Sequence, residues 1–374
     1  MLVGVPKEIK NHEYRVGMTP GSVRELVRHG HAVIVQKDAG SAIGLSDEQY
    51  AAAGAALADG AEEVFARAQL IVKVKEPQPE ECRRLRPDQI LFTYLHLAPD
   101  PRQTDLLLAS GVTAIAYETV SDRFGALPLL TPMSEVAGRM SIQVGAASLE
   151  KTRGGSGVLL SGVPGVSPGR VTILGGGVVG SNAARIAIGL GAEVTVIDRS
   201  LDRLRSLHGQ FGNRLRTRHL TEEAIESSVV EADLIIGAIL VPGATTPHLL
   251  RREQLGKLRP GAVLVDVSID QGGCFETSHP TTHADPTFIV DGIVHYCVAN
   301  MPGAVARTST FALNNATLPF TLALADKGCR RALLDDPHLR NGLNIHQGKI
   351  TYGAVAEVRG LTWTPAEKAL ENGA

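Results

Sequence analysis

The chain of 374 residues lacks the features that mark several large classes of protein. Its 37 basic and 39 acidic residues nearly cancel, which argues against a nucleic-acid-binding protein, because such proteins normally present a basic face. No apolar run reaches the roughly 18 residues that a membrane-spanning helix needs. The first residues show no charged and apolar leader, so we expect a cytoplasmic protein without a membrane partner.

Cysteine is also scarce. Cys82, Cys274, Cys297 and Cys329 are far apart and form no C-x-x-C pair, so reduced thiols packed as small apolar side chains are the simplest interpretation. The composition that remains is 44% apolar and 20% charged, which is typical of a globular protein. At about 150 residues per domain, the length predicts two or three domains.

Short apolar strands alternate with helical patterns in the first block of the chain. The expected strands are rich in Val, Ile and Leu: Leu2–Val5, Ala32–Val35, Leu70–Val74, Ile90–Tyr94 and Thr113–Ala116. The expected helices between them are Gly21–His29, Asp47–Ala58 and Pro101–Ala109. Such alternation predicts a parallel sheet with helices on both faces.

A second alternating block begins near residue 130. It opens with an expected long helix over Ser134–Lys151 and a Gly-, Ser- and Pro-rich loop over Gly154–Gly169. The expected elements that follow are strands at Val171–Leu174, Glu193–Ile197, Leu234–Ala238, Ala262–Val267 and Ile293–Cys297, and a helix at Val178–Leu190. After residue 307 the pattern is mostly helical, and it does not indicate which block this tail joins.

A glycine motif stands between the first strand and helix of this block. Gly175, Gly177 and Gly180 have the spacing G-x-G-x-x-G, and the next strand runs into Asp198, 18 residues after Gly180. In dinucleotide-binding folds these glycines permit a tight turn and close approach of the pyrophosphate, and the acid binds a ribose diol. We therefore expect NAD here, with Asp198 disfavouring NADP, although the adjacent Arg199 weakens that preference. A glycine-rich turn without a ligand is the alternative.

Four polar residues follow expected strands, where open α/β sheets bind ligands. Lys75, expected on the same face as Lys73, could bind a carboxylate or polarise a carbonyl, and His96 could transfer protons near neutral pH. Asp270 precedes two glycines, and Arg15 could pair with a carboxylate. The structural alternatives are an edge-strand lysine, a structural histidine, an Asx turn and a solvated arginine. Together the four predict hydride transfer with a small anionic substrate in a cleft between two domains.

The chain resembles the bacterial alanine dehydrogenases over essentially its full length. The matching segments are Gly4–Lys10 with Glu13–Arg15, Val74–Pro77, Tyr94–His96, Gly175–Gly180, Ile269–Glu276 and His295–Pro302. The resemblance implies an α/β fold of two Rossmann-like domains with parallel sheets, the first of them discontinuous. Residues 1–126 and 307–374 would form the substrate and catalytic domain, and residues 127–306 the NAD-binding domain. It also implies a homohexamer.

The same resemblance implies NAD-dependent, reversible oxidative deamination of L-alanine to pyruvate and ammonium. It assigns Arg15 and Lys75 to substrate binding, and His96, as acid/base, and Asp270 to catalysis. The cofactor contacts that it implies are Ser134, Gly175, Gly177, Val178, Val179, Gly180, Asp198, Arg203, Ile239, Leu240, Val267, Ser268, Ile269, Asp270, Val298, Ala299, Asn300 and Met301.

The sequence departs from some relatives at a magnesium site. Ala323 and Lys327 stand where those relatives carry an acid and a histidine, so no metal is expected. Two alternatives to the dehydrogenase stay open. One is a soluble NAD(H)-binding subunit of a transhydrogenase, which passes hydride between nucleotides and needs a membrane partner. The other is a non-catalytic NAD sensor.

Overall fold

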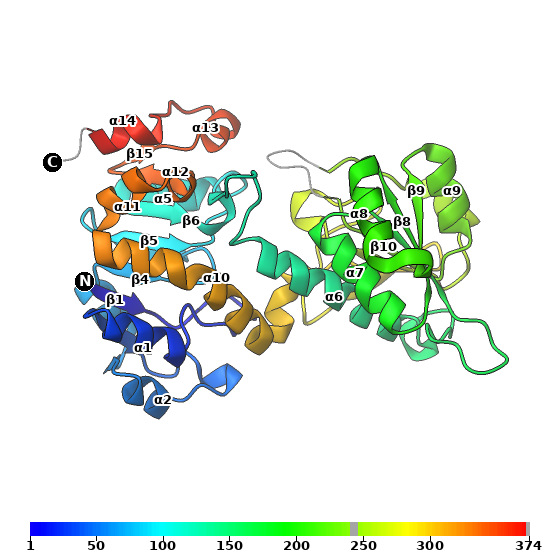
Figure 1. The fold of residues 1–374 in the computed structure, drawn as a ribbon, viewed down its shortest axis with the longest axis horizontal. Helices are drawn as coiled ribbons and strands as arrows, with labels where there is room; N and C mark the ends of the chain where they lie inside the picture. Colours follow the sequence, from blue (N-terminus) through cyan, green and yellow to red (C-terminus); the bar gives the residue numbers. More distant parts are fainter. Residues whose placement is uncertain (240–245, 372–374) are drawn as a thin grey trace. The chain divides into compact units, whose positions relative to one another are not determined.

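The computed structural model describes residues 1–239 and 246–371, which form two compact α/β units (Figure 1). The first unit joins Met1–Met133 to the segment from Val305 onward, and the second unit is Ser134–Ala304. The first unit is therefore built from both ends of the chain, coloured blue to cyan and orange to red in Figure 1. The prediction that residues 1–126 and 307–374 form the substrate and catalytic domain, and that residues 127–306 form the NAD-binding domain, stays a proposal.

A sheet of eight strands, counted over the described residues, organises the first unit in the order β15-β14-β6-β5-β4-β1-β2-β3. Its strands are β1 Leu2–Val5, β2 Ala32–Gln36, β3 Ala56–Ala58, β4 Leu70–Val72, β5 Ile90–Thr93, β6 Thr113–Ala116, β14 Leu343–His346 and β15 Lys349–Ile350. Strands β1 to β6 are parallel, whereas β14 and β15 join the edge antiparallel. The chain order reverses between β1 and β4, and ligands bind at such a switch point.

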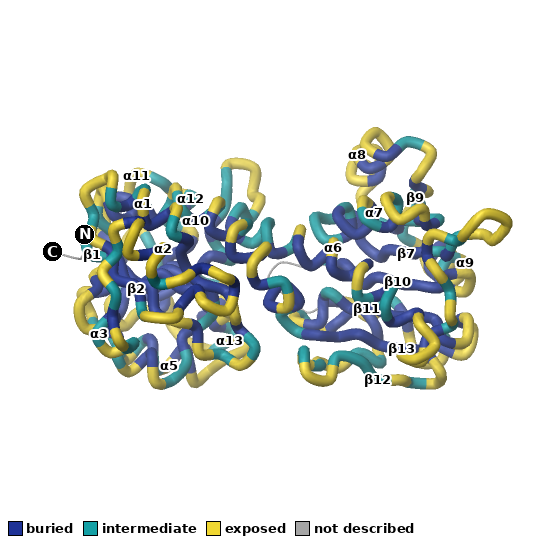
Figure 2. Tube along the Cα trace, turned by 90° about the horizontal axis from the view of Figure 1, so that it is seen from below, coloured by how far each residue is buried: buried dark blue, intermediate teal, exposed yellow. Residues whose placement is uncertain are grey.

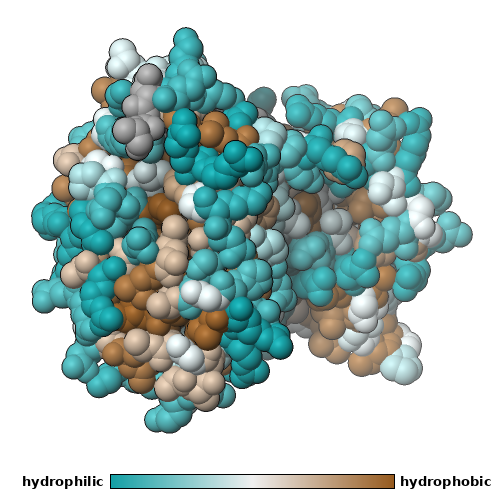
Figure 3. Space-filling view, turned by 60° about the vertical axis from the view of Figure 1, so that its left-hand side comes forward, coloured by the Kyte–Doolittle hydropathy of each residue, from teal (hydrophilic) through white to brown (hydrophobic). Residues whose placement is uncertain are grey.

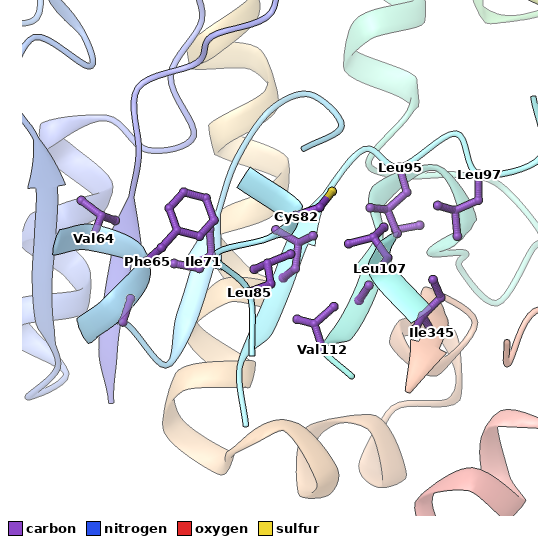
Figure 4. Packing of buried hydrophobic residues seen from close by; sticks show 14 of the residues in the cluster. Val64, Phe65, Ile71, Cys82, Leu85, Leu95, Leu97, Leu107, Val112 and Ile345 are labelled. Atoms are coloured by element: carbon purple, nitrogen blue, oxygen red, sulfur yellow. The ribbon is translucent and has the colours of Figure 1, made fainter. Parts of the chain in front are cut away.

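Helices cover both faces of this sheet. Figure 2 shows α1 and α10 on one side of the buried strands and α3 and α5 on the other. The helices of the unit are α1 Pro20–Arg28, α2 Asp47–Ala52, α3 Ala61–Arg67, α4 Pro79–Cys82, α5 Pro101–Ser110, α10 Ala306–Lys327, α11 Cys329–Asp335, α12 Pro337–Arg340, α13 Gly353–Arg359 and α14 Ala366–Glu371. Phe65, Ile71 and Leu107 are among the fully buried side chains that join α3 and α5 to the sheet (Figure 4).

Two expectations for this unit were wrong in detail. The helix expected over Asp47–Ala58 ends at Ala52, because Gly54 takes a left-handed φ of 98° and the chain continues as β3. The strand expected over Leu70–Val74 ends at Val72. The tail is mostly helical, as expected, and two short strands in it, β14 and β15, extend the first sheet.

The second unit contains a sheet of seven strands within the described ranges, in the order β12-β13-β11-β10-β7-β8-β9. Its strands are β7 Arg170–Leu174, β8 Glu193–Asp198, β9 Leu215–His219, β10 Leu234–Gly237, β11 Val263–Asp266, β12 Thr287–Val290 and β13 Ile293–Tyr296. All are parallel except β12, which pairs antiparallel with β13 at the edge. The switch point lies between β7 and β10, and Leu174 is in register with Gly237 there.

The helices of this unit are α6 Thr131–Ser148, α7 Val178–Gly189, α8 Leu201–Phe211 and α9 Glu222–Val230, of which α8 and α9 were not predicted. Two glycines let α6 approach its neighbours closely. A Cβ at Gly138 would lie 2.2 Å from the carbonyl oxygen of Val179, and one at Gly145 would lie 2.6 Å from Leu234 Cδ1. Among the helices that the structure describes, none is long and apolar enough to cross a bilayer.

Candidate active site

Four polar residues of the first unit follow its parallel strands at the same edge of the sheet. Arg15, Lys75 and His96 come after β1, β4 and β5, and Glu118 comes after β6. The strands are in register, with Val72 beside Phe92 and Thr93 beside Ala116. The loops that carry these side chains therefore start side by side, as expected for Arg15, Lys75 and His96.

Arg15 is a buried residue and not the solvated arginine of the structural alternative. Its side chain is 2% exposed. Its Nε lies 2.6 Å from Glu13 Oε1, and its Nη2 lies 2.6 Å from Glu13 Oε2. Its Nη1 donates to the sulfur of Met133 at 3.1 Å. Burial lowers the pKa of Arg15, but the hydrogen bonds and charge of Glu13 outweigh burial and raise that pKa. The guanidinium is thus permanently charged and fixed in orientation.

Lys75 lies beyond the end of β4 and is 12% exposed. Its Nζ is 3.4 Å from Glu76 Oε2, and Glu76 also pairs with Lys10 through Oε1. The backbone carbonyl of Lys75 accepts a hydrogen bond of 3.0 Å from the hydroxyl of Thr93 on β5. Burial raises the pKa of Glu76, but the two lysines outweigh burial and lower that pKa to about 2. Two cations therefore surround one carboxylate at this strand end.

His96 has an unusual backbone conformation for a residue with a side chain, with φ of 49°. The backbone N–H of His96 donates to Glu118 Oε1 at 2.6 Å, and the backbone N–H of Leu95 also donates to this carboxylate. The ring stacks parallel to Tyr94 at a centroid distance of 5.8 Å, and its Nδ1 lies 4.0 Å from Glu118 Oε1. The side chain stays 43% exposed, so it is accessible for proton transfer.

Sequence reasoning missed the carboxylates that hold these groups. Glu118 is 22 residues from His96 in the chain, and its position two residues after β6 is the one signal that could have indicated it. Lys73 was expected to share a face with Lys75, but β4 has already ended there, and Lys73 is fully buried between Glu8 and Glu81. A cavity of about 130 Å³ lies beside Glu76 and Lys10, and neither Arg15 nor His96 lines it.

The glycine motif of the second unit has the geometry that a pyrophosphate needs. Gly175 takes φ of 103°, and a Cβ there would lie 2.6 Å from the carbonyl oxygen of Ala238. A Cβ at Gly180 would lie 1.8 Å from the carbonyl oxygen of Gly175, so α7 packs tightly on the turn. Among the residues that the structure describes, no atom outside the neighbouring chain lies within 4 Å of a Cβ built on Gly177, which caps α7. Gly177 is thus open above an N-terminus that attracts anions, and the loop fits a dinucleotide.

Asp198, the last residue of β8, lies beside this loop. Its Oδ2 accepts the N–H of Gly176 at 2.6 Å, and its Oδ1 accepts the N–H of Ser200 at 2.7 Å. Each carboxylate oxygen can accept a second hydrogen bond, as a ribose diol would supply. The side chain of Arg203 borders the same turn, since its Cγ is 3.2 Å from a Cβ built on Gly176. The turn, Asp198 and Arg203 therefore lie together, and their contact with NAD stays a prediction.

Most of the other predicted cofactor residues follow the carboxyl ends of three further strands of this sheet. Val267–Asp270 follow β11, Val298–Met301 follow β13, and Ile239 follows β10. Ser268 donates its hydroxyl to the carbonyl of Ile239 at 2.6 Å, which joins two of these loops. Val178 and Val179 form the first turn of α7, and Ser134 lies in α6. Leu240 lies outside the described residues.

Asp270 is exposed in the short 3-10 helix Ile269–Gln271, and a buried acid holds its loop. Asp266, the last residue of β11, accepts hydrogen bonds from the N–H groups of Ser268 and Cys274 and from the hydroxyl of Ser278. Burial raises the pKa of Asp266 despite these donors. Sequence reasoning missed this residue, although it ends a strand.

A metal centre is not evident in residues 1–239 and 246–371. They contain no group of three or more His, Cys, Asp or Glu side chains that could hold an ion. The expected absence of magnesium at Ala323 and Lys327 stays a prediction.

Comparison with known proteins gives consistent matches over the whole chain. Residues 4–137 match the family described as alanine dehydrogenase/PNT, N-terminal domain, and residues 141–353 match its C-terminal domain. The alanine dehydrogenase of Halomonas elongata is 62% identical over 98% of this chain and 99% of its own length. That of Bacillus subtilis is 54% identical over 100% of this chain and 98% of its own length.

Solved structures agree with these matches. An L-alanine dehydrogenase superposes with a TM-score of 0.93 at 51% identity, covering 96% of this chain and 99% of that one. A transhydrogenase from Sinorhizobium meliloti superposes with a TM-score of 0.78 over 95% of this chain and 100% of that one. Its identity of 22% shows a shared fold alone. The chain belongs to the alanine dehydrogenase/PNT family.

Proposed function

We propose that this protein is an amino-acid dehydrogenase that catalyses the reversible, NAD-dependent oxidative deamination of L-alanine to pyruvate and ammonium. The observation that carries the proposal is the placement of Arg15, Lys75 and His96 at one edge of one sheet. Support comes from relatives named alanine dehydrogenase that are 51–62% identical to the chain. The family and the glycine loop imply a nicotinamide cofactor, and Asp198 favours NAD over NADP.

The first unit supplies the groups that act on the substrate. Arg15 binds the carboxylate of alanine or pyruvate, and Glu13 keeps the guanidinium in a fixed plane. Lys75 donates to the carbonyl oxygen of pyruvate and stabilises the negative charge that develops on the carbinolamine oxygen. His96 takes a proton from water as water adds to the imine and returns a proton as the carbinolamine collapses. Asp270, which belongs to the second unit, would orient the water or ammonium and favour positive charge on nitrogen.

The second unit supplies the groups that hold the cofactor. The turn Gly175–Gly180 and the N-terminus of α7 would hold the pyrophosphate, and Asp198 would accept hydrogen bonds from the ribose. The loops that follow β10, β11 and β13 would hold the rest of the dinucleotide. A nicotinamide held by these residues would supply the hydride acceptor for the substrate Cα, so the chain needs no nucleophilic side chain of its own.

The homohexamer and the cytoplasmic location are further proposals that rest on the resemblance. The surface of the first unit supports association, since large apolar side chains are exposed there: Phe124, Phe311, Val358 and Trp363. Figure 3 shows an apolar area among polar side chains on the face of this unit turned to the viewer. Contiguous exposed apolar areas are typical of protein interfaces.

One assay separates the candidate functions. The purified protein is incubated with pyruvate, ammonium and NADH, and the loss of NADH absorbance is followed. We expect NADH oxidation that requires both pyruvate and ammonium and yields alanine. Hydride exchange between two nucleotides without pyruvate would indicate the transhydrogenase subunit instead, and NADH binding without turnover would indicate a sensor.

A further inference from the structure

Lys73 is a charged side chain for which the proposed reaction has no use, and it is completely buried. Its Nζ lies 3.0 Å from Glu8 Oε2 and 2.8 Å from Glu81 Oε1, and both carboxylates are at most 2% exposed. Removing three charged groups from water is expensive, and buried ion pairs often contribute little net stability. This triad of Lys73, Glu8 and Glu81 therefore calls for an explanation other than stability.

The second oxygen of each carboxylate reveals what the triad holds. Glu8 Oε1 accepts the backbone N–H of Val74 at 2.7 Å, and Glu81 Oε2 accepts the backbone N–H of Gln78 at 2.8 Å. Each carboxylate thus links the Lys73 ammonium to the main chain. The two anchored amides lie on either side of Lys75 and Glu76.

This segment continues past the end of the strand, where two backbone hydrogen bonds tie it to the chain of β5: the N–H of Lys73 donates to the carbonyl of Phe92, and the carbonyl of Val74 accepts the N–H of Tyr94. Strand β4 ends at Val72, and residues 73–75 have no strand or helix structure of their own. The triad adds anchors at the amides of Val74 and Gln78, and the Thr93 hydroxyl adds a contact at the carbonyl of Lys75. All of these partners are buried or part-buried, so solvent screens them little.

We infer that Lys73, together with Glu8 and Glu81, is a positioning residue that fixes the place of Lys75 relative to the substrate. The inference rests on the proposed function, because it gives Lys75 a substrate to bind. Lys73 touches no reacting atom and acts through the main chain of residues 74–78. Small displacements of a binding group weaken binding strongly, so loss of the triad should appear first in the affinity for pyruvate.

The test is the dissociation constant of pyruvate for the NADH complex of the full chain, measured without ammonium through the fluorescence of bound NADH. In Lys73→Met, which keeps the length of the side chain and removes its charge, we expect pyruvate to bind about tenfold more weakly. NADH affinity should stay within about twofold of the original. Lys37→Met is the matched control, since Lys37 is a half-exposed lysine of the same unit, paired with Asp59. It should change neither constant, and equal loss of pyruvate affinity in the control would overturn the inference.

A double variant separates positioning from general damage to the fold. If Lys73 acts through Lys75, adding Lys73→Met to Lys75→Ala should not weaken pyruvate binding further. A second, independent loss in the double variant would overturn the inference and leave the proposed function intact. Unchanged pyruvate affinity in Lys75→Ala alone would instead remove Lys75 from substrate binding. The inference about Lys73 and the role of Lys75 in the proposed function would then both be wrong.

Glu81→Gln provides the test if Lys73→Met does not fold. It leaves Lys73 paired with Glu8 and weakens the two contacts of Glu81, with the Lys73 ammonium and with the N–H of Gln78. We expect pyruvate to bind about threefold more weakly with unchanged NADH affinity, and unchanged pyruvate affinity would contradict the inference.

Discussion

The two units differ in what their carboxylates hold. In the first unit, carboxylates accept main-chain amides, as Glu118 does at His96, and they also form buried or partly buried ion pairs with the functional cations: Glu13 holds Arg15, and Glu76 contacts Lys75. In the second unit, carboxylates hold the main chain: Asp198 accepts the amides of Gly176 and Ser200, and Asp266 accepts those of Ser268 and Cys274. The comparison suggests a division of labour, in which the first unit offers side-chain charge to a small substrate and the second offers backbone to a nucleotide.

This difference determines what each unit can tolerate. The first unit should be sensitive to loss of charge at strand ends, because a buried charge without its partner is strongly destabilised. The second unit should be sensitive to added atoms at its glycines, because a Cβ fills the space that the turn or the ligand needs. Substitutions in the two units should therefore affect different binding constants.

The largest effect should follow from Lys75→Ala. Without the ammonium, the developing charge on the substrate oxygen has no donor from this position, and kcat/KM for pyruvate should fall by roughly 10²–10³-fold. NADH affinity should be retained, which titration of NADH fluorescence would show. An increase in KM with kcat intact would mean that Lys75 binds the substrate without stabilising the transition state.

His96→Ala should reduce kcat by on the order of 10²-fold in both directions, because proton transfer during addition and collapse loses its acid/base. Steady-state rates at saturating pyruvate, ammonium and NADH provide the measurement. Near-normal turnover in this variant would exclude His96 from the mechanism.

In the second unit, Asp198→Ala should relax the preference for NAD over NADP by about tenfold, since a charged hydrogen-bond acceptor for the ribose is lost. The ratio of kcat/KM values for the two cofactors is the quantity to compare. If the ratio does not change, another residue distinguishes the ribose from its 2′-phosphate.

Gly177→Ala and Gly180→Ala form a matched pair in the same turn. The first adds a methyl group that meets no atom of residues 1–239 and 246–371 within 4 Å beyond its own chain neighbours, so it should weaken NADH binding by about tenfold and leave the melting temperature unchanged. The second places Cβ 1.8 Å from the Gly175 carbonyl oxygen and should destabilise the fold by about 1–3 kcal/mol. Calorimetry and NADH titration on both variants provide the measurements. A lower melting temperature for Gly177→Ala than for Gly180→Ala would contradict this assignment.

The smallest effect should come from Glu76→Gln and should depend on pH. The pKa of Glu76 in the folded protein is about 2, below the ordinary value of 4.5, so its ionised form stabilises the fold above pH 4.5. That contribution is lost as pH falls towards 2. The wild-type protein should exceed Glu76→Gln in free energy of unfolding by about 1 kcal/mol at neutral pH, and the difference should shrink in acid. Denaturant titrations at several pH values would refute this if the difference grew as pH fell.

Much of the fold could be predicted because buried parallel strands are short apolar runs. The strands at Leu2–Val5 and Thr113–Ala116 lie where they were expected. Strand β9, Leu215–His219, was missed because it is largely polar and lies at the edge of its sheet. Strand β14 was missed because its partner β6 is more than 200 residues away, and no local pattern encodes that pairing.

The candidate site shows the same limit. Strand ends indicated Arg15, Lys75, His96 and Asp270, since their position follows from the local pattern. The partner of His96 did not emerge, because Glu118 and its contact at His96 are joined only by the register of β5 and β6. The early end of β4 also made one prediction wrong. Strict alternation along a strand would place Lys73 and Lys75 on the same face, but β4 ends at Val72 and the two side chains lie in different surroundings.

The division between substrate unit and cofactor unit can be tested by one pair of titrations on two variants. Dissociation constants of NADH, and of pyruvate at saturating NADH, are measured for Lys75→Ala and for Gly177→Ala. The account predicts opposite patterns: Lys75→Ala binds pyruvate weakly and NADH normally, and Gly177→Ala binds NADH weakly and, once NADH is saturating, pyruvate normally. Equal loss of both affinities in either variant, or the reverse pattern, would contradict it.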